Sequence, residues 1–313
     1  MNTQGKKTSS LAGRDLLTLA DLQSSELQDL LQLAIDLKQG KVKPQAQKNL
    51  GLLFSKASTR TRVSFSAAIF QLGGQVLDLN PSVTQVGRGE PIADTARVLS
   101  RYLDILAIRT FAQSDLETYA HYADIPVINA LTDLYHPCQI LADLLTLQEQ
   151  FGDLKGLTLV YLGDGNNVAH SLMLGCALAG VNVRIATPEG YAPLPEVVEK
   201  ATQLAAEHQT QVEVTQDPKA AVAGANALYT DVWASMGQES EADSRIPLFQ
   251  PYQVNEDLLS RADSQAIVLH CLPAHRGEEI TDGVMEGGQS KVWDQAENRL
   301  HAQKALLASL LGL

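Results

Sequence analysis

Short apolar runs alternate with amphipathic stretches along almost the whole chain. This alternation predicts an α/β protein of two domains, each a mainly parallel sheet flanked by helices. The length of 313 residues suits two domains that each bury a core of their own. Hydrophobic residues make up 45% of the chain and charged residues 19%, a balance that excludes a disordered or fibrous protein. The apolar runs are continuous, as expected of strands covered by helices on both faces.

Nine strands are predicted from runs of leucine and β-branched residues. In the first half of the chain they are 51–54, 75–79, 104–108 and 127–129, and in the second half 158–162, 182–186, 212–214, 227–230 and 266–269. Apolar residues at helical spacing predict helices over 24–38, 60–72, 92–103, 172–179, 196–208 and 295–310. This order is typical of parallel strands joined by helical crossovers.

A further helix is predicted over 137–151, where apolar residues recur at helical spacing until Gly152 ends the pattern. We expect this helix to be the hinge between a first domain, 1–147, and a second domain, 148–292. The segment 293–313 is expected to be a C-terminal helix that returns to pack on the first domain.

Charge and composition exclude several functions. Acidic residues outnumber basic ones by 36 to 24, and a net charge of −12 argues against a nucleic-acid-binding protein. An anionic ligand would therefore need a local arginine cluster. No apolar run approaches the roughly 18 residues of a membrane span, and the first apolar patch, 16–20, lies between two aspartates, unlike a secretory signal. Three distant cysteines without a CxxC pair argue against a disulfide scaffold or a structural zinc site. We expect a cytoplasmic protein.

The strongest local signal is Ser58-Thr59-Arg60-Thr61-Arg62, which follows a predicted strand and opens a helix. A helix start presents unpaired N–H groups and a partial positive charge, so it receives anions. Hydroxyl and guanidinium groups add donors suited to a phosphate. The alternative is a helix start capped by its own Ser or Thr side chains.

His136-Pro137-Cys138-Gln139 forms a second candidate site, because Pro137 favours the first turn of a helix. A neutral imidazole and a primary amide there can donate to a carbonyl or phosphoryl oxygen. The alternative for His136 is a helix cap, and Cys138 is expected to pack as a small apolar residue.

Gly163-Asp164-Gly165-Asn166-Asn167 follows the strand that opens the second half. A dinucleotide-binding loop would need glycine at position 168, where Val168 stands, and this argues against a nucleotide-binding oxidoreductase. The loop is better interpreted as a tight turn that presents asparagine amides to a polar ligand.

Two later loops also carry reactive side chains. The first, 231–237, places Asp231 directly after a strand, and the second, 270–277, holds His270, Cys271 and His275 close together. These last three are conceivable metal ligands, but no second cluster with zinc spacing accompanies them, so we expect no metal. A serine hydrolase is disfavoured because the G-x-S-x-G motif is absent.

From about Leu16 to the C-terminus the chain resembles the ornithine carbamoyltransferases. The motifs that carry the resemblance occur in family order at 54–62, 87–90 (Gly-Arg-Gly-Glu), 94–99, 136–139, 231–237 (Asp-Val-Trp-Ala-Ser-Met-Gly), 270–273 (His-Cys-Leu-Pro) and 296–299. The first and fourth are shared with aspartate carbamoyltransferases, whereas 231–237, 270–273 and Lys56 are similar to the ornithine branch. Ser66 departs from the glutamate that many relatives carry, and the Ala274-His275-Arg276 continuation is similar to biosynthetic enzymes.

The resemblance implies that 1–147 binds carbamoyl phosphate, that 148–292 binds ornithine, and that no cofactor is used. Implied contacts for carbamoyl phosphate are Ser58, Thr59, Arg60, Thr61, Gln85, Arg109, His136, Pro137, Cys138, Gln139, Cys271, Leu272 and Arg299. Gln85 would come from a neighbouring subunit of a homotrimer. Implied contacts for L-ornithine are Asn167, Asp231, Ser235 and Met236, and implied catalytic residues are Arg109, His136 and Cys271.

The implied reaction transfers the carbamoyl group to the δ-amine of L-ornithine and gives L-citrulline and phosphate, in arginine biosynthesis. One alternative is a transcarbamylase for another amine, such as putrescine or acetylornithine. Another is a catalytically silent relative that serves as a binding or assembly subunit, although every expected site position is occupied.

Overall fold

The computed structural model describes residues 10–81, 85–234 and 242–313. It divides into two units, the first comprising Met1–Cys138 and Arg299–Leu313 and the second Gln139–Asn298. Both divisions lie inside continuous helices, α5 (Pro137–Phe151) and α12 (Val292–Leu310). The boundaries expected from sequence, 147/148 and 292/293, differ from these by several residues because an unbroken helix shows no change of composition where one unit ends.

The first unit contains a four-stranded parallel sheet in the order β2–β1–β3–β4. Its strands are β1 (Asn49–Phe54), β2 (Gln75–Asp78), β3 (Ile105–Arg109) and β4 (Val127–Leu131). The two central strands are buried, with Leu50 opposite Ile105. The expectation of cover on both faces is wrong for β2, whose four residues are all exposed, because it lies at the edge of the sheet.

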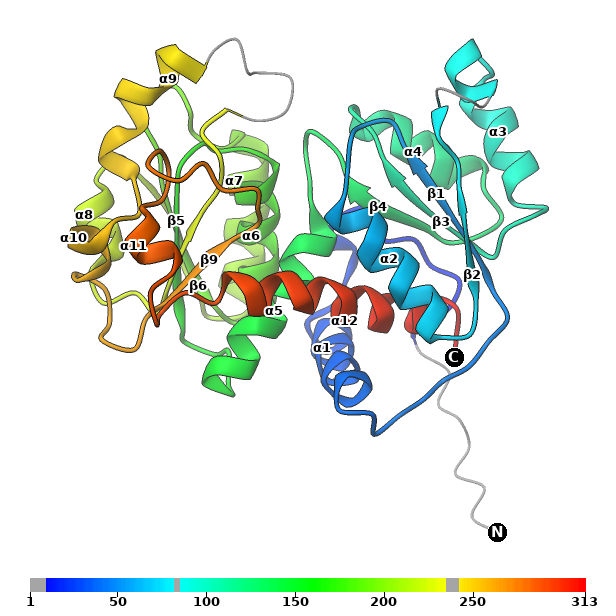
Figure 1. The fold of residues 1–313 in the computed structure, drawn as a ribbon, viewed down its shortest axis with the longest axis horizontal. Helices are drawn as coiled ribbons and strands as arrows, with labels where there is room; N and C mark the ends of the chain where they lie inside the picture. Colours follow the sequence, from blue (N-terminus) through cyan, green and yellow to red (C-terminus); the bar gives the residue numbers. More distant parts are fainter. Residues whose placement is uncertain (1–9, 82–84, 235–241) are drawn as a thin grey trace. The chain divides into compact units, whose positions relative to one another are not determined.

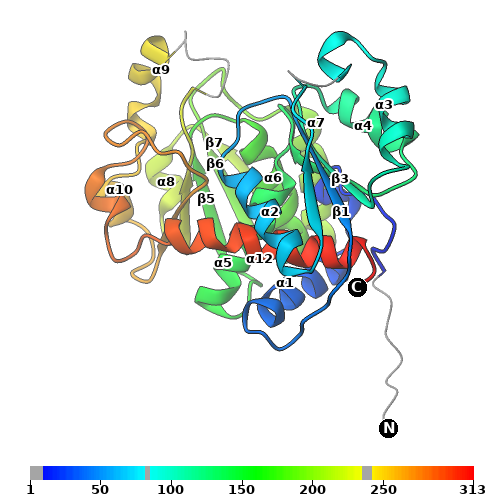
Figure 2. The ribbon, with the colours of Figure 1, turned by 45° about the vertical axis from the view of Figure 1, so that its right-hand side comes forward.

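Helices α3 (Ile92–Leu99) and α4 (Gln113–Tyr122) cover one face of this sheet, where Leu116 and Tyr119 pack with Leu106 and Ile108. Helix α4 was not predicted, because only two of its ten residues are buried and it shows little apolar periodicity. The described part of the unit also contains α1 (Ser24–Lys38), α2 (Arg60–Gln71) and the short η1 (Leu19–Asp21) and η3 (Gln85–Arg88). The carboxyl half of α12 runs beside α2 (Figures 1 and 2), and Lys304 Nζ donates to Gln71 Oε1 at 2.9 Å.

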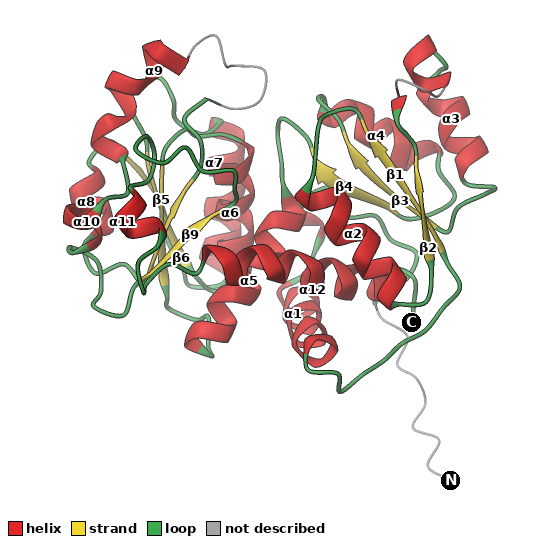
Figure 3. Cartoon of the chain, viewed as in Figure 1, coloured by secondary structure: helices red, strands yellow, loops and turns green. Residues whose placement is uncertain are grey.

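The second unit contains a five-stranded parallel sheet in the order β7–β6–β5–β8–β9. Its strands are β5 (Thr158–Leu162), β6 (Asn182–Ala186), β7 (Val212–Thr215), β8 (Ala227–Thr230) and β9 (Ile267–His270). All nine strands predicted for the chain are present, and Figure 3 shows them as two groups.

Helices α6 (Asn167–Ala179) and α7 (Pro195–Glu207) pack together on one face of the second sheet. The short α8 (Pro218–Val222), α10 (Glu256–Leu259) and α11 (Asp282–Met285) lie on the other face, around Val160, Leu228 and Val268. Helix α9 (Ala242–Phe249) and η5 (Gln250–Tyr252) also belong to this unit. Helix α6 begins five residues before the predicted start at 172, because every residue from Val168 to Ala179 is buried and no polar face marks its first turn.

The described part of the chain contains no helix with the length and apolar character needed to cross a membrane. In both sheets the strands are parallel, so the loops that carry the sequence motifs leave each sheet at the carboxyl ends of the strands.

Candidate active site

The Ser58–Arg62 motif, which the sequence predicts to bind an anion, lies at the start of α2. Arg60 is the first residue of this twelve-residue helix, and Thr59 precedes it without making a side-chain hydrogen bond to the helix. The alternative that the Thr59 side chain caps this helix is therefore not observed. Thr59 and Arg60 are exposed and Ser58 is half-buried, so the first-turn N–H groups and the nearby hydroxyls can meet an anion.

Two buried arginines and one buried histidine lie in the first unit, as the Ser58–Arg62 motif does. The side chain of Arg299, on α12, donates from Nη2 to Thr61 Oγ1 at 2.7 Å. Arg109 ends β3 and His136 immediately precedes α5. Arg299 is 3% exposed, His136 6% and Arg109 7%. Two guanidinium groups enclosed by protein are a strong anion-binding feature, because charge–charge attraction increases where water is excluded.

His136 is held neutral by its surroundings. Burial, together with the charges of Arg299 and Arg109, keeps the pKa of His136 well below its usual value. A neutral imidazole can donate one hydrogen bond to a carbonyl oxygen without taking up a proton. A donor of this kind can polarise a carbonyl group as negative charge develops on its oxygen.

Cys138 follows in the first turn of α5, and its side chain faces the protein interior. Its thiol donates to the carbonyl oxygen of Asn129 at 3.3 Å, and burial raises the pKa of the thiol to about 12. The side chain packs as predicted from sequence, so that only backbone atoms of this residue are suited to a ligand. Gln139, one position further on, is 1% exposed.

In the second unit, a carboxylate is held at the carboxyl end of β8. Asp231 is 7% exposed and accepts hydrogen bonds from Cys271 Sγ at 3.0 Å, from its neighbour Val232 N at 2.8 Å and from Asn166 Nδ2 at 3.0 Å. Asn166 also caps α6 by accepting from Val168 N and Ala169 N. One asparagine therefore fixes both the start of α6 and the orientation of Asp231.

The loop after β9 is held by a buried His–Glu pair. His270 Nε2 lies 2.9 Å from Glu279 Oε1, and both side chains are fully buried. His270 Nδ1 accepts from Leu272 N at 2.8 Å, so the ring proton is on Nε2 and is donated to Glu279. Leu272 has φ 62°, a strained value for this residue type. The imidazole thus holds the backbone that presents Cys271 beside Asp231.

The three conceivable metal ligands of the sequence, His270, Cys271 and His275, lie in two different clusters of possible ligand atoms. Asp231, His270 and Cys271 have donor atoms within 4.8 Å of one another, whereas His275 clusters with Glu278 and Glu279 instead. Both ring nitrogens of His270 already make hydrogen bonds. A metal ion bound by this ring would have to displace one of these two hydrogen bonds.

Some predicted residues are not brought to these clusters. Gln85 is exposed in η3. Asn167 is half-buried as the first residue of α6, one position beyond the residue that bonds Asp231. Ser235 and Met236 lie outside the described residues. Asn166 and Glu279 support these clusters but are absent from the predicted contacts. Asn166 lies in the 163–167 motif, whereas Glu279 lies outside every motif.

Comparison with known proteins agrees with this geometry. The carbamoyl-P binding domain of the aspartate/ornithine carbamoyltransferase family matches residues 14–149, and its Asp/Orn binding domain matches 155–310. The ornithine carbamoyltransferase of Nostoc punctiforme is 72% identical over 96% of this chain and 98% of that protein. A crystal structure of the Gloeobacter violaceus ornithine carbamoyltransferase is 57% identical, with TM-score 0.89 over 97% of this chain and 100% of that one.

A structure of the Pyrococcus furiosus ornithine carbamoyltransferase is 53% identical, with TM-score 0.93 over 97% of this chain and 98% of that one. These alignments cover nearly all of this chain and nearly all of each relative, so the similarity includes both units. The chain therefore belongs to the ornithine carbamoyltransferases of the aspartate/ornithine carbamoyltransferase family.

Proposed function

We propose that this chain transfers the carbamoyl group of carbamoyl phosphate to the δ-amine of L-ornithine, releasing L-citrulline and phosphate. The observation that carries the proposal is the neutral, buried His136 beside Arg109 and Arg299. The two arginines suit the departing phosphate, and the imidazole suits the carbamoyl oxygen.

Carbamoyl phosphate is assigned to 1–147 and L-ornithine to 148–292, with 293–313 returning to the first of these. Ser58, Thr59, Arg60 and Thr61 would bind the phosphate. Asn167, Asp231, Ser235 and Met236 would bind the amino-acid end of ornithine. Asp231 supports an amine-bearing substrate, because its carboxylate suits an ammonium group, whereas the second carboxylate of aspartate would be repelled.

The δ-amine must lose a proton before it attacks. With a pKa near the 10.4 of lysine, only about one ornithine molecule in 2,500 carries a neutral δ-amine at pH 7, a handicap of about 4.6 kcal/mol. Cys271 and its partner Asp231 would bind the neutral amine or take up the proton that it loses, and His136 would stabilise the tetrahedral oxyanion. Residues of the chain suffice for each step, since phosphate leaves with its charge held by arginine.

The test is the initial rate with carbamoyl phosphate against ornithine, putrescine, acetylornithine and aspartate, scored by carbamoylated product. Citrulline formed far faster than the other products supports the proposal. Preference for putrescine or acetylornithine would keep the carbamoyl phosphate half and overturn the Asp231 assignment. No product from folded protein would favour a silent relative.

The two halves are separable by substitution. Arg60→Ala is expected to lose carbamoyl phosphate binding, and Asp231→Ala mainly ornithine binding. Equal loss of both ligands in each variant would contradict the division. Activity is expected to rise between about pH 6 and 8.5 because amine deprotonation limits attack; a flat profile for both kcat and kcat/KM would contradict this.

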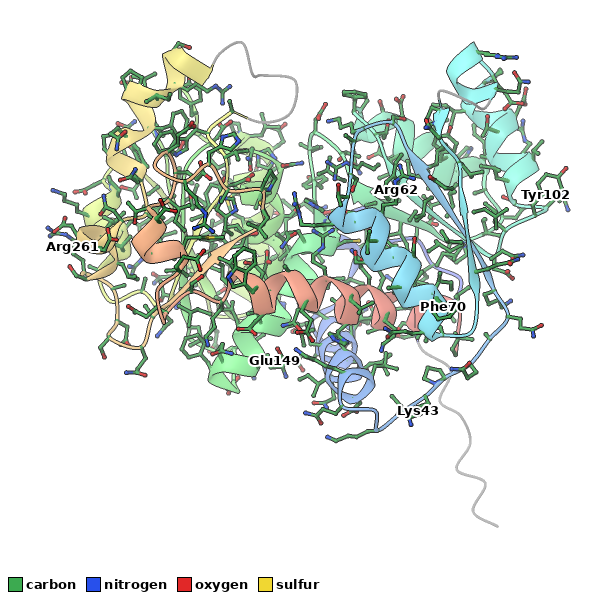
Figure 4. All side chains as sticks on the ribbon, in the orientation of Figure 1. Lys43, Arg62, Phe70, Tyr102, Glu149 and Arg261 are labelled. Atoms are coloured by element: carbon green, nitrogen blue, oxygen red, sulfur yellow. The ribbon has the colours of Figure 1, made fainter. Side chains whose placement is uncertain are left out.

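A homotrimer with Gln85 contributed across the interface is part of the proposal. Val63 and Phe70, seven residues apart on one face of α2, are 62% and 77% exposed, and Figure 4 labels Phe70 near the carboxyl end of that helix. Val76 and Leu77 are exposed on the neighbouring edge strand β2, and Gln85 follows that strand. An apolar sheet edge of this kind favours protein contact, and a second copy covering it would come close to Gln85.

Mixing two inactive variants tests this arrangement. Arg60→Ala and Gln85→Ala subunits, refolded together, should form sites in which one subunit supplies Arg60 and the next Gln85, so that activity returns. Failure of the mixture to regain activity, with a monomer by light scattering, would overturn the shared site. A role in arginine biosynthesis follows from the proposed product, and a cytoplasmic location is part of the proposal.

A further inference from the structure

A fully buried carboxylate on α5 lies one helical turn after Gln139. Asp143 is 0% exposed, and its Oδ1 accepts from Gln139 Nε2 at 2.8 Å and from Gln295 Nε2 at 2.7 Å. Tyr229 also bonds to this carboxylate, and burial together with Asp143 raises the pKa of that tyrosine. All four groups belong to the second unit.

The orientation of each amide in this network is determined by its partners. Gln295 Oε1 accepts from the backbone N–H of His270 at 2.8 Å, so its Nε2 must point toward Asp143 and Tyr229. A carboxylate only accepts hydrogen bonds, so the Gln139 amide must likewise turn its NH₂ group to Asp143. Its carbonyl oxygen, Oε1, is then directed away from Asp143.

Burying a carboxylate is costly even when hydrogen bonds satisfy it, and apolar residues of similar volume often stabilise a core better. A role beyond stability is therefore reasonable for Asp143. The reverse orientation of Gln139 would place its carbonyl oxygen against the carboxylate, which is electrostatically unfavourable. Asp143 thus selects one of the two orientations of the amide.

We propose that Asp143 is a positioning residue that fixes the Gln139 amide with its oxygen toward the carbamoyl NH₂, and so selects a carbamoyl over an acetyl group. The inference rests on the proposed function, which assigns Gln139 to the carbamoyl end of carbamoyl phosphate. His136 then donates to the carbamoyl oxygen while Gln139 accepts from its nitrogen. A methyl group in place of NH₂ would leave the Gln139 oxygen without its donor.

Two stable phosphonates measure this selection. Phosphonoacetamide carries the carbamoyl-type NH₂, and 2-oxopropylphosphonate is its counterpart with a methyl group. The wild type is expected to bind the amide about tenfold more tightly or better, the difference made by one satisfied buried acceptor. Asp143→Leu keeps the branched shape of the side chain but has no acceptor. It should reduce this ratio to a value between about 1 and 2, as expected when one buried hydrogen bond is lost.

Matched variants separate positioning from general damage. Asp143→Asn keeps an amide oxygen able to accept from both glutamines and should retain much of the preference. Gln139→Leu should abolish it, and adding Asp143→Leu should change the ratio no further. Thr146→Val removes another buried polar group of α5, which accepts from Asn298 rather than contacting Gln139, and it should lower stability while leaving the ratio unchanged.

The outcomes distinguish the inference from the function on which it rests. If wild type binds neither phosphonate, the proposed function fails. If it binds both equally, or if Asp143→Leu weakens both by the same factor, the positioning role is wrong while phosphate binding stands. Should Asp143→Leu fail to fold, a crystal structure of wild type with phosphonoacetamide decides: the Gln139 oxygen on the ligand nitrogen supports the inference, and its NH₂ group there overturns it.

Discussion

Burial and two neighbouring guanidinium groups keep the imidazole of His136 neutral, and this is a property of its environment rather than of histidine itself. The same principle applies at Cys138 and Cys271. Burial raises the pKa of the first thiol to about 12, whereas the second is partly exposed and donates to Asp231. Of these two cysteines, one packs in the interior and the other donates a hydrogen bond to a buried carboxylate.

The depressed pKa of His136 predicts a pH dependence of stability. As pH falls below the ordinary histidine value of about 6.5, the unfolded chain binds a proton at this position and the folded chain does not, so the free energy of unfolding decreases. In His136→Asn the free energy of unfolding should therefore fall less steeply with decreasing pH, by up to about 1.4 kcal/mol per pH unit. Urea unfolding at pH 7.5, 6.5 and 5.5 measures it. The exposed-site variant His121→Asn is the control, and equal slopes in wild type and His136→Asn would contradict the prediction.

Asn166 joins a helix cap to a proposed ornithine-binding residue, because it caps α6 and donates to Asp231. Asn166→Ala is expected to lower the free energy of unfolding by about 1–2 kcal/mol, as for other lost caps, and to raise the KM for ornithine. The KM for carbamoyl phosphate should stay near the wild-type value. Asn255→Ala removes the cap of α10 without touching Asp231, and it should cost stability alone; a raised ornithine KM in both variants would argue against the positioning role.

At the scale of elements, the loop between β5 and α6 depends on close packing of backbone against backbone. Gly165 donates its N–H to Tyr191 O at 2.8 Å, and a Cβ at this position would lie 2.3 Å from Pro193 N. The glycine that superficially resembles a dinucleotide-binding motif is therefore required for contact between two loops. A buried ion pair, Arg245 Nη1 to Asp164 Oδ2 at 2.8 Å, ties α9 to the same loop.

Gly165→Ala should lower the free energy of unfolding by about 1–3 kcal/mol, because the obstructing atoms are backbone and cannot move aside cheaply. It should also weaken ornithine binding through the displaced Asn166. Gly288→Ala is the matched control, since an added Cβ there meets no atom within 4 Å. Thermal unfolding compares the two, and similar melting temperatures for both variants would show that the Gly165 contact is not needed.

At the scale of the whole molecule, α12 contributes to both units. Its first residues, including Gln295 and Asn298, bond within the second unit, whereas Arg299 bonds Thr61 in the first. Beyond Arg299 the helix supplies core residues of the first unit, namely Ala302, Ala305, Leu306, Leu307, Ala308 and Leu310. The first unit is therefore completed by the last residues of the chain.

Truncation after Asn298 is expected to unfold the first unit, because it removes several fully buried leucines, each worth roughly 1.5–3 kcal/mol of burial. Arg299→Gln should instead leave the fold intact and weaken carbamoyl phosphate binding. Hydrogen exchange of the backbone amides of β1 and β3 distinguishes an unfolded first unit in the truncated chain from a folded one in Arg299→Gln. Native protection of these strands in the truncated chain would mean that the first unit is stable without the end of α12.

The fold class follows from patterns that are local in sequence. Nine short apolar runs and the helices between them, including 24–38 and 137–151 with their observed bounds, are visible because buried strands and amphipathic helices impose local periodicity. Family motifs likewise indicate the reaction from residue identity alone. Helix α4, which is largely exposed, and the first turn of α6, which is buried from Val168 onward, lack such periodicity and are absent from the prediction.

Tertiary packing decides everything that depends on distant partners. The pKa of His136 depends on arginines 27 positions before and 163 after it, the orientation of Gln139 depends on Asp143 and Gln295, and Cys271 meets a carboxylate 40 positions away. Periodicity reports only how a segment meets its immediate surroundings. Protonation, amide orientation and hydrogen-bond partners depend on which residues surround a group in the folded chain. A sequence motif identifies some of these residues but does not give their positions.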